Sequence, residues 1–173
     1  MVSNLADLHF APTETAKNNL IRENKKKENI FVVGNTVIDA LLSTVKENYR
    51  FADKEIEDIE EHKRVILVTT HRRENLGTPM HHVYKALRRL VETVPHTEVV
   101  FPVHRNPLVR EAVEEELEGV PGIHLVEPME YEPFTNLMAR SSIVLTDSGG
   151  IQEEAPSLGK PVLVLLSLIH ISE

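Results

Sequence analysis

A glycine turn between an apolar strand and a carboxylate-bearing helix is the part of this sequence most suited to chemistry. The β-branched run 142–146 leads into Asp-Ser-Gly-Gly at 147–150, and a short helical stretch then carries Glu154. Glycines where a strand becomes a helix let the backbone approach a ligand, and the free N–H groups of the helix favour an anion there. A carboxylate about one helical turn further on could accept hydrogen bonds from ribose hydroxyls. The pattern therefore predicts a nucleotide site.

The same turn has a purely structural interpretation. Asp147 or Ser148 could cap the helix that follows, because short polar side chains accept hydrogen bonds from the first helical N–H groups. Taken alone, the four residues of the turn leave capping and ligand binding open.

The elements that must position this turn alternate between strand and helix. Apolar runs predict strands near 30–33, 65–69, 98–103, 123–126, 142–146 and 161–166. Helical periodicity predicts helices near 35–47, 53–62, 79–94, 107–118, 133–140 and 150–158. Such alternation is typical of a Rossmann-like α/β fold, in which a parallel sheet has helices on both faces.

Further polar segments follow the ends of three predicted strands. In a parallel sheet the carboxyl ends of the strands lie at one edge, where ligands gather. The segments are 71–75 after strand 65–69, 104–106 after strand 98–103, and 130–134 after strand 123–126. Together with the glycine turn they predict a single site at this edge.

Four side chains in these segments could serve chemistry, and each has a structural alternative. His71 could carry a proton to or from a departing phosphate, or it could only cap a helix. Arg72 could hold a phosphate by two hydrogen bonds, or pair with a neighbouring carboxylate on the surface. His104 precedes a proline that can open a helix, so a role in the turn is as well supported as a role in binding. Phe134 could stack on a base or pack in the core.

Composition excludes several classes of partner. The net charge of −8 argues against nucleic acid or an anionic membrane as the partner. The absence of cysteine excludes disulfides and thiolate zinc sites. No apolar run reaches the ~20 residues that a membrane span needs, and the first residues lack the order of a signal peptide. We therefore expect a soluble, cytoplasmic protein.

No metal or other cofactor is predicted. Histidines and carboxylates are present in the sequence, but no group of them has the spacing of metal ligands. The expected ligand is thus a small anion such as a nucleotide, held by protein groups alone.

Motifs along nearly the whole chain occur in the order found in one enzyme family. The chain resembles the non-hydrolysing UDP-N-acetylglucosamine 2-epimerases, both in Thr70-His71-Arg72-Arg73-Glu74-Asn75 and in the long block around the glycine turn. The matching segments are 10–14, 34–40, 70–75, 102–107, 131–134 and 145–164. The resemblance implies one lobe of a two-lobe, GT-B-like architecture.

This resemblance also implies an activity and the residues that serve it. Family members interconvert UDP-N-acetylglucosamine and UDP-N-acetylmannosamine by elimination and re-addition of UDP, through a 2-acetamidoglucal intermediate. On this basis His71 is expected in catalysis, and Arg72 and His104 at a second, allosteric UDP-N-acetylglucosamine. The residues expected to hold UDP are Phe134, Ser148, Gly149, Gly150 and Glu154.

The resemblance further implies that the chain is part of a larger enzyme. Residues 1–14 are similar to the end of a first lobe and its linker, 15–166 to the UDP-binding domain, and 167–173 has no counterpart. The carboxylates that serve carbon 2 in the family lie in that first lobe, so the isolated chain is expected to be inactive. A homodimer is expected of the full-length protein. Two alternatives stay open, a lobe of a UDP-sugar-dependent glycosyltransferase and a nucleotide-binding domain without catalysis.

Overall fold

The computed structural model describes residues 5–70 and 77–165 of the 173-residue chain. Contacts divide the chain into two compact units, Met1–Ser43 and Thr44–Glu173. The sequence predicts different boundaries: the end of a first lobe after residue 14, and the start of a tail after residue 166. These two boundaries stay predictions. His71 and Arg72 lie outside the described residues.

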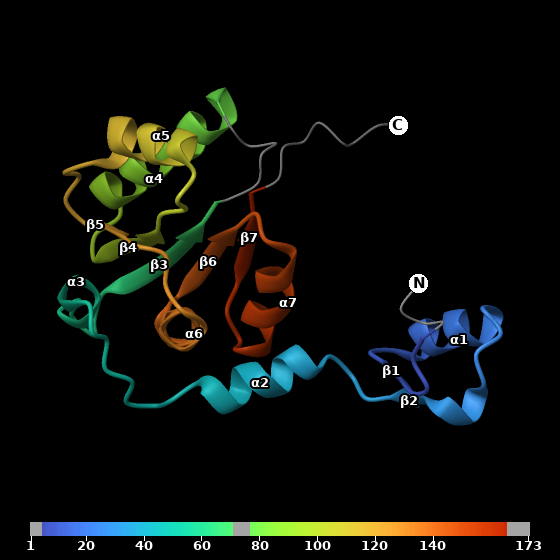
Figure 1. The fold of residues 1–173 in the computed structure, drawn as a ribbon. Coiled ribbons are helices and arrows are strands. Elements are labelled where there is room, and N and C mark those ends of the chain that lie inside the picture. The colour runs from blue at the N-terminus through green and yellow to red at the C-terminus, as the bar shows by residue number, and fades with distance from the viewer. Residues whose placement is uncertain (1–4, 71–76, 166–173) are drawn as a thin grey trace. The chain divides into compact units, whose positions relative to one another are not determined.

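The first unit is a small parallel β-α-β motif. Its elements are β1 (His9–Ala11), α1 (Glu14–Arg22), a short 3-10 turn η2 (Lys27–Asn29) and β2 (Ile30–Val32), and α2 (Thr36–Thr44) follows (Figure 1). Thr13 caps α1, because its hydroxyl accepts a hydrogen bond from the Ala16 N–H at 3.1 Å. The helix α1 was not predicted from the sequence; its nine residues include few apolar side chains, and none of them is buried.

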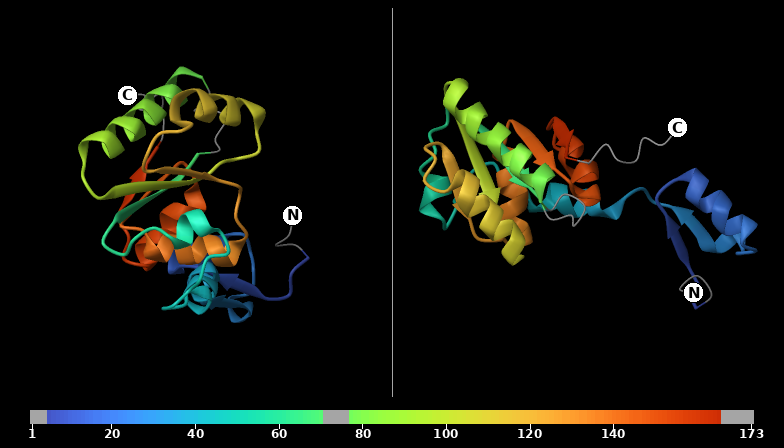
Figure 2. Two further views of the ribbon diagram at one scale, coloured as in Figure 1. Left: turned by 90° about the vertical axis from the view of Figure 1, so that its left-hand side faces the viewer. Right: turned by 90° about the horizontal axis from the view of Figure 1, so that it is seen from above.

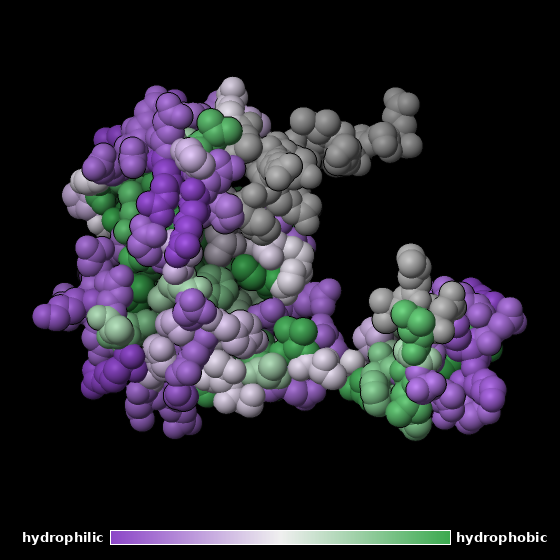
Figure 3. All heavy atoms as spheres, viewed as in Figure 1, coloured by the Kyte–Doolittle hydropathy of each residue, from purple (hydrophilic) through white to green (hydrophobic). Residues whose placement is uncertain are grey.

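Apolar side chains lie exposed on this first unit (Figure 3). Phe10 and Phe31 sit side by side with ring centroids 5.9 Å apart, and they are 65% and 47% exposed. Parallel strands are normally covered on both faces. A two-stranded parallel sheet with exposed aromatic rings is therefore typical of the edge of a larger sheet.

The second unit is built on a five-stranded, wholly parallel sheet in the order β5-β4-β3-β6-β7. The strands are β3 (Arg64–Thr69), β4 (Thr97–Pro102), β5 (Ile123–Val126), β6 (Ile143–Thr146) and β7 (Val162–Val164). The helices are α3 (Lys54–Glu57), α4 (Thr78–Thr93), α5 (Pro107–Leu117), α6 (Tyr131–Arg140) and α7 (Gly149–Ser157). Figures 1 and 2 show α4 and α5 on one face of the sheet and α6 and α7 on the other. The predicted fold class is confirmed.

The core of this unit fills the space between the sheet and the α4–α5 layer. Phe101 of β4 and Tyr84 of α4 are fully buried, with ring centroids 5.6 Å apart. Alternate residues of the central strands, such as Ile66 and Val68 of β3, face the same cluster. This packing fixes the strand ends that carry the polar loops.

One predicted helix is much shorter in the structure. The helix expected over 53–62 is confined to Lys54–Glu57, capped by Asp53. The Arg140 guanidinium donates hydrogen bonds to the carbonyl oxygens of Ile56 and Ile59, which holds the following chain in a turn. Hydrogen bonds from a distant arginine thus take the place of the backbone hydrogen bonds that the next helical turn would make. In the described part of the chain, no helix is long and apolar enough to cross a membrane.

Candidate functional site

The glycine turn joins β6 to α7 at the carboxyl edge of the sheet, as predicted. Ser148 is the N-cap residue of α7, but its side chain makes no capping hydrogen bond. The first helical bond in this turn runs from the Gln152 N–H to the Ser148 carbonyl at 3.3 Å. The N–H groups of Gly149 and Gly150 precede that bond and have no partner within the helix. They are suited to an anion, because the positive end of the helix dipole lies there.

Two threonine hydroxyls lie directly beneath the turn. Thr69 of β3 and Thr146 of β6 are register partners, and their Oγ1 atoms are 2.6 Å apart. The Ser148 N–H donates a hydrogen bond to Thr146 Oγ1 at 3.0 Å. The turn is therefore held by a side chain of its own strand, which is itself bonded to the neighbouring strand.

Glu154 lies beside the turn on α7. A Cβ added to Gly150 would lie 3.9 Å from Glu154 Oε1, so the carboxylate sits close to the glycine backbone. Burial, and to a lesser degree the charge of Glu153, raises the pKa of Glu154. Among the described residues, no hydrogen bond or ion pair engages the Glu154 carboxylate. It is available to accept hydrogen bonds from ligand hydroxyls.

A second buried polar group lies directly after β3. The Tyr84 hydroxyl is 2.9 Å from Thr70 Oγ1, and both residues are buried. Asp147, which precedes the glycine turn, is fully buried and adds its negative charge to the surroundings of Tyr84. Tyr84 was not predicted from the sequence; a tyrosine among the apolar positions of helix 79–94 is the signal that could have identified it.

Replacing Tyr84 with phenylalanine is expected to reduce the loss of stability at alkaline pH. Burial raises the pKa of Tyr84 from 10.0 to about 12. Because only the unfolded tyrosine ionises between these values, the free energy of unfolding is intact below pH 10 and falls by about 1 kcal/mol toward pH 11. Urea titrations at neutral and alkaline pH should show a smaller drop for Tyr84→Phe. Equal drops in both proteins would contradict the burial of this hydroxyl.

The structure places two further predicted residues at or near this edge. His104 follows β4 and is exposed, and its Nδ1 accepts a hydrogen bond from the Asn106 N–H at 3.1 Å. Asn106 in turn caps α5, so His104 shapes the entry to that helix. Phe134 is half-buried in the first turns of α6, whose start also lies at the carboxyl edge. The structure thus supports a structural role for His104 and leaves its predicted role in binding untested.

Three groups able to hold a metal come together between α4 and α5. His81 Nδ1 lies 2.9 Å from Glu116 Oε1 and 3.9 Å from Glu115 Oε2. Sequence spacing could not reveal this group, because it comes from two helices. Lys85 Nζ is 3.4 Å from the same Glu116 oxygen, and the hydrogen bond from His81 is the main cause of the lowered pKa of Glu116. The arrangement is explained as an ion-pair network that links two packed helices.

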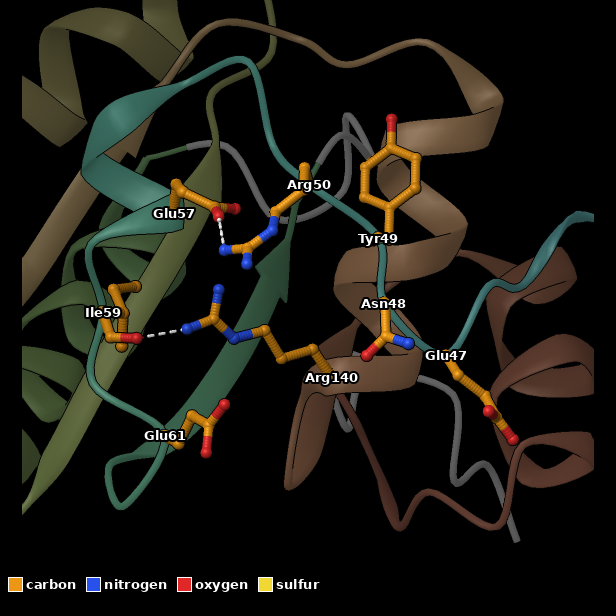
Figure 4. Close-up of a pocket in the computed structure, with 8 residues that line it drawn as sticks. All are labelled: Glu47, Asn48, Tyr49, Arg50, Glu57, Ile59, Glu61 and Arg140. Atoms are coloured by element: carbon orange, nitrogen blue, oxygen red, sulfur yellow. Dashed lines mark hydrogen bonds and ion pairs between the residues drawn. The ribbon is translucent and has the colours of Figure 1, made fainter.

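A cavity of about 330 Å³ lies away from the glycine turn, at the amino edge of the sheet (Figure 4). Its two arginines are already engaged, since Arg50 bonds Glu57 at 2.6 Å and Arg140 bonds the carbonyls of Ile56 and Ile59. These contacts join the segment before β3 to the end of α6. We therefore assign this cavity a structural role.

A parallel sheet with helices on both faces, a glycine turn at the end of β6 and a carboxylate beside it define a Rossmann-like lobe whose carboxyl edge is suited to an anion. The model of the UDP-N-acetylglucosamine 2-epimerase family matches residues 1–167. The chain therefore belongs to the UDP-N-acetylglucosamine 2-epimerase family.

Several relatives are close in sequence and in structure. The UDP-N-acetylglucosamine 2-epimerase of Bacillus subtilis (strain 168) is 54% identical over 165 residues, which cover 95% of this chain and 43% of the relative. The structure of S. aureus MnaA with UDP is 49% identical, with a TM-score of 0.83 over 96% of this chain and 45% of that one. The Neisseria meningitidis enzyme bound to UDP-GlcNAc is 46% identical, with a TM-score of 0.77 over 94% of this chain and 45% of that one. The likeness confirms the predicted GT-B-like lobe.

The matched region is only part of these relatives. The chain spans less than half the length of each of the three. The sequence-based prediction of a partial enzyme agrees with this coverage.

Proposed function

We propose that this chain is the UDP-binding lobe of an enzyme that interconverts UDP-N-acetylglucosamine and UDP-N-acetylmannosamine. The observation that carries the proposal is the pairing of the α7 glycine turn with the unengaged carboxylate of Glu154. Phosphate oxygens would accept from the first N–H groups of α7, and ribose hydroxyls would donate to Glu154. The relatives with UDP and UDP-GlcNAc support this choice of ligand over other anions.

Each predicted site residue has a role in this proposal. Ser148, Gly149 and Gly150 hold the diphosphate, and Phe134 lies against the uracil ring. His71 exchanges a proton with the departing UDP during elimination and re-addition. As the family resemblance implies, Arg72 and His104 bind a second UDP-N-acetylglucosamine that acts as an activator.

The whole enzyme would require groups beyond this lobe. Epimerisation removes a proton at carbon 2 and breaks the bond between carbon 1 and oxygen, so it needs acid and base groups on both faces of the sugar. We propose that the 173-residue chain binds UDP without turnover. For the full-length enzyme we propose a homodimer in the cytoplasm.

Replacing Glu154 with glutamine is expected to weaken UDP binding and to change its pH dependence. Hydrogen bonds to a charged group contribute about 1.5–3 kcal/mol, which corresponds to a loss of about tenfold to a hundredfold in affinity at neutral pH. Because the pKa of Glu154 is raised, the wild-type affinity should fall on acidification sooner than it would for an ordinary glutamate. Calorimetric titration with UDP at several pH values measures both effects.

The control for the loss of affinity at neutral pH is Glu153→Gln, which makes the same change of charge at the exposed neighbouring position. The terminal phosphate of UDP also titrates near pH ~6, but it does so equally with all three proteins. The difference between the wild type and Glu154→Gln thus isolates the carboxylate. Equal affinities for the wild type and Glu154→Gln would reject the role given to Glu154, and a folded wild-type chain that binds no UDP would reject the proposed function.

A further inference from the structure

The hydroxyl pair of Thr69 and Thr146 has a geometry that bears on the ligand site. Thr146 is fully buried, and its Oγ1 contacts both Thr69 Oγ1 at 2.6 Å and the Ser148 N–H at 3.0 Å. A threonine hydroxyl offers one donor and two acceptor positions, so Thr146 can satisfy both partners at once. Neither threonine needs to touch a ligand to influence it.

The bond to Thr146 decides which N–H groups of the turn remain for an anion. The Ser148 N–H points back to its own strand and is engaged. The next N–H groups, those of Gly149 and Gly150, belong to the first turn of α7. Their orientation follows from that of the fixed Ser148 backbone. The preceding residue is fixed as well, because the Asp147 N–H donates to the Thr69 carbonyl at 3.3 Å. The backbone N–H groups of both Asp147 and Ser148 are thus hydrogen-bonded to residues at the ends of β3 and β6.

We propose that Thr146, held by Thr69, is a positioning residue for the nucleotide site. It orients the first N–H groups of α7 and so increases the affinity for the diphosphate. The proposal rests on the proposed function, since it concerns the same ligand. Pre-organised donors bind an anion more tightly than mobile ones, because less ordering is needed on binding.

Two substitutions of Thr146 distinguish the effect of its hydroxyl group from the effect of its branched shape. Thr146→Val keeps the branched shape and removes the hydroxyl, whereas Thr146→Ser keeps the hydroxyl. We expect Thr146→Val to lower the affinity for UDP about tenfold and Thr146→Ser to restore most of it, because one positioned hydrogen bond is lost and regained. Amide hydrogen exchange gives a readout without ligand: the Ser148 N–H should exchange faster in Thr146→Val and slowly in Thr146→Ser.

The control is Thr97→Val, which removes the hydroxyl of another buried threonine at the start of β4, at the opposite edge of the sheet. Thr97 Oγ1 lies 3.5 Å from the Pro95 carbonyl, so its loss tests a purely structural hydroxyl. Unchanged UDP affinity in Thr97→Val, with a loss in Thr146→Val, supports the proposal. If Thr146→Val, Thr97→Val and the wild type all bind UDP with equal affinity, the positioning role of Thr146 is overturned while the proposed function stands. A wild-type chain without UDP affinity overturns both.

Discussion

Gly150→Ala should lose most of its affinity for UDP while it stays as stable as the wild type or becomes more stable. The added methyl group would lie 3.9 Å from Glu154 Oε1, an ordinary contact, so the fold has room for it. Alanine is also the better helix residue, by up to about 1 kcal/mol. The same methyl group would occupy the space between the turn and the carboxylate, where the proposed ligand lies. Overpacking of this kind costs about 1–3 kcal/mol, or about fivefold to a hundredfold in affinity.

Thermal unfolding and calorimetric titration of the same sample test both halves of this expectation. Ser157→Ala is the matched control, because it also places alanine on α7 but in the exposed last turn. It should bind UDP as the wild type does. If Gly150→Ala bound UDP with wild-type affinity, the ligand would not approach the glycine backbone and the account of the turn would be wrong.

The second large effect concerns the core that holds the strand ends in place. Phe101→Ala is expected to lower the free energy of unfolding by about 3–5 kcal/mol, because it leaves a cavity against Tyr84 in a fully buried layer. Such a loss is a large part of the total stability of a small domain. Urea unfolding followed by circular dichroism measures it.

Phe10→Ala serves as the control for the core substitution. Phe10 is 65% exposed and belongs to the first unit, so its removal should change the free energy of unfolding by no more than about 0.5 kcal/mol. Similar losses for both phenylalanines would mean that the layer between β4 and α4 is not the core of the second unit.

The strands of the second unit could be predicted from the sequence because each is a short apolar run between polar turns. The run 65–69, for example, corresponds to β3 (Arg64–Thr69). The helix α1 was missed because few of its nine residues are apolar and none of them is buried. The helix expected over 53–62 is short because Arg140, far along the chain, takes the carbonyls that a longer helix would use.

The glycine turn could be predicted because its parts are neighbours in sequence. The hydroxyl pairs near it could not, because their members come from different elements: Thr69 and Thr146 are 77 residues apart, and Thr70 and Tyr84 are 14 apart. Periodicity assigns such residues to strands and helices but does not show which hydroxyls meet. The same limit hid the contact between His81 and Glu116, which are 35 residues apart.

The most direct test of the central claim is a UDP titration of the ¹⁵N-labelled chain followed by nuclear magnetic resonance. We expect saturable shifts of the amide signals of Ser148, Gly149 and Gly150, together with those at the start of α6. The amides around the amino-edge cavity, such as those of Arg50 and Glu57, should not move. Shifts confined to that cavity, or no saturable shift in a folded chain, would contradict the assignment of the nucleotide site to the carboxyl edge of the sheet.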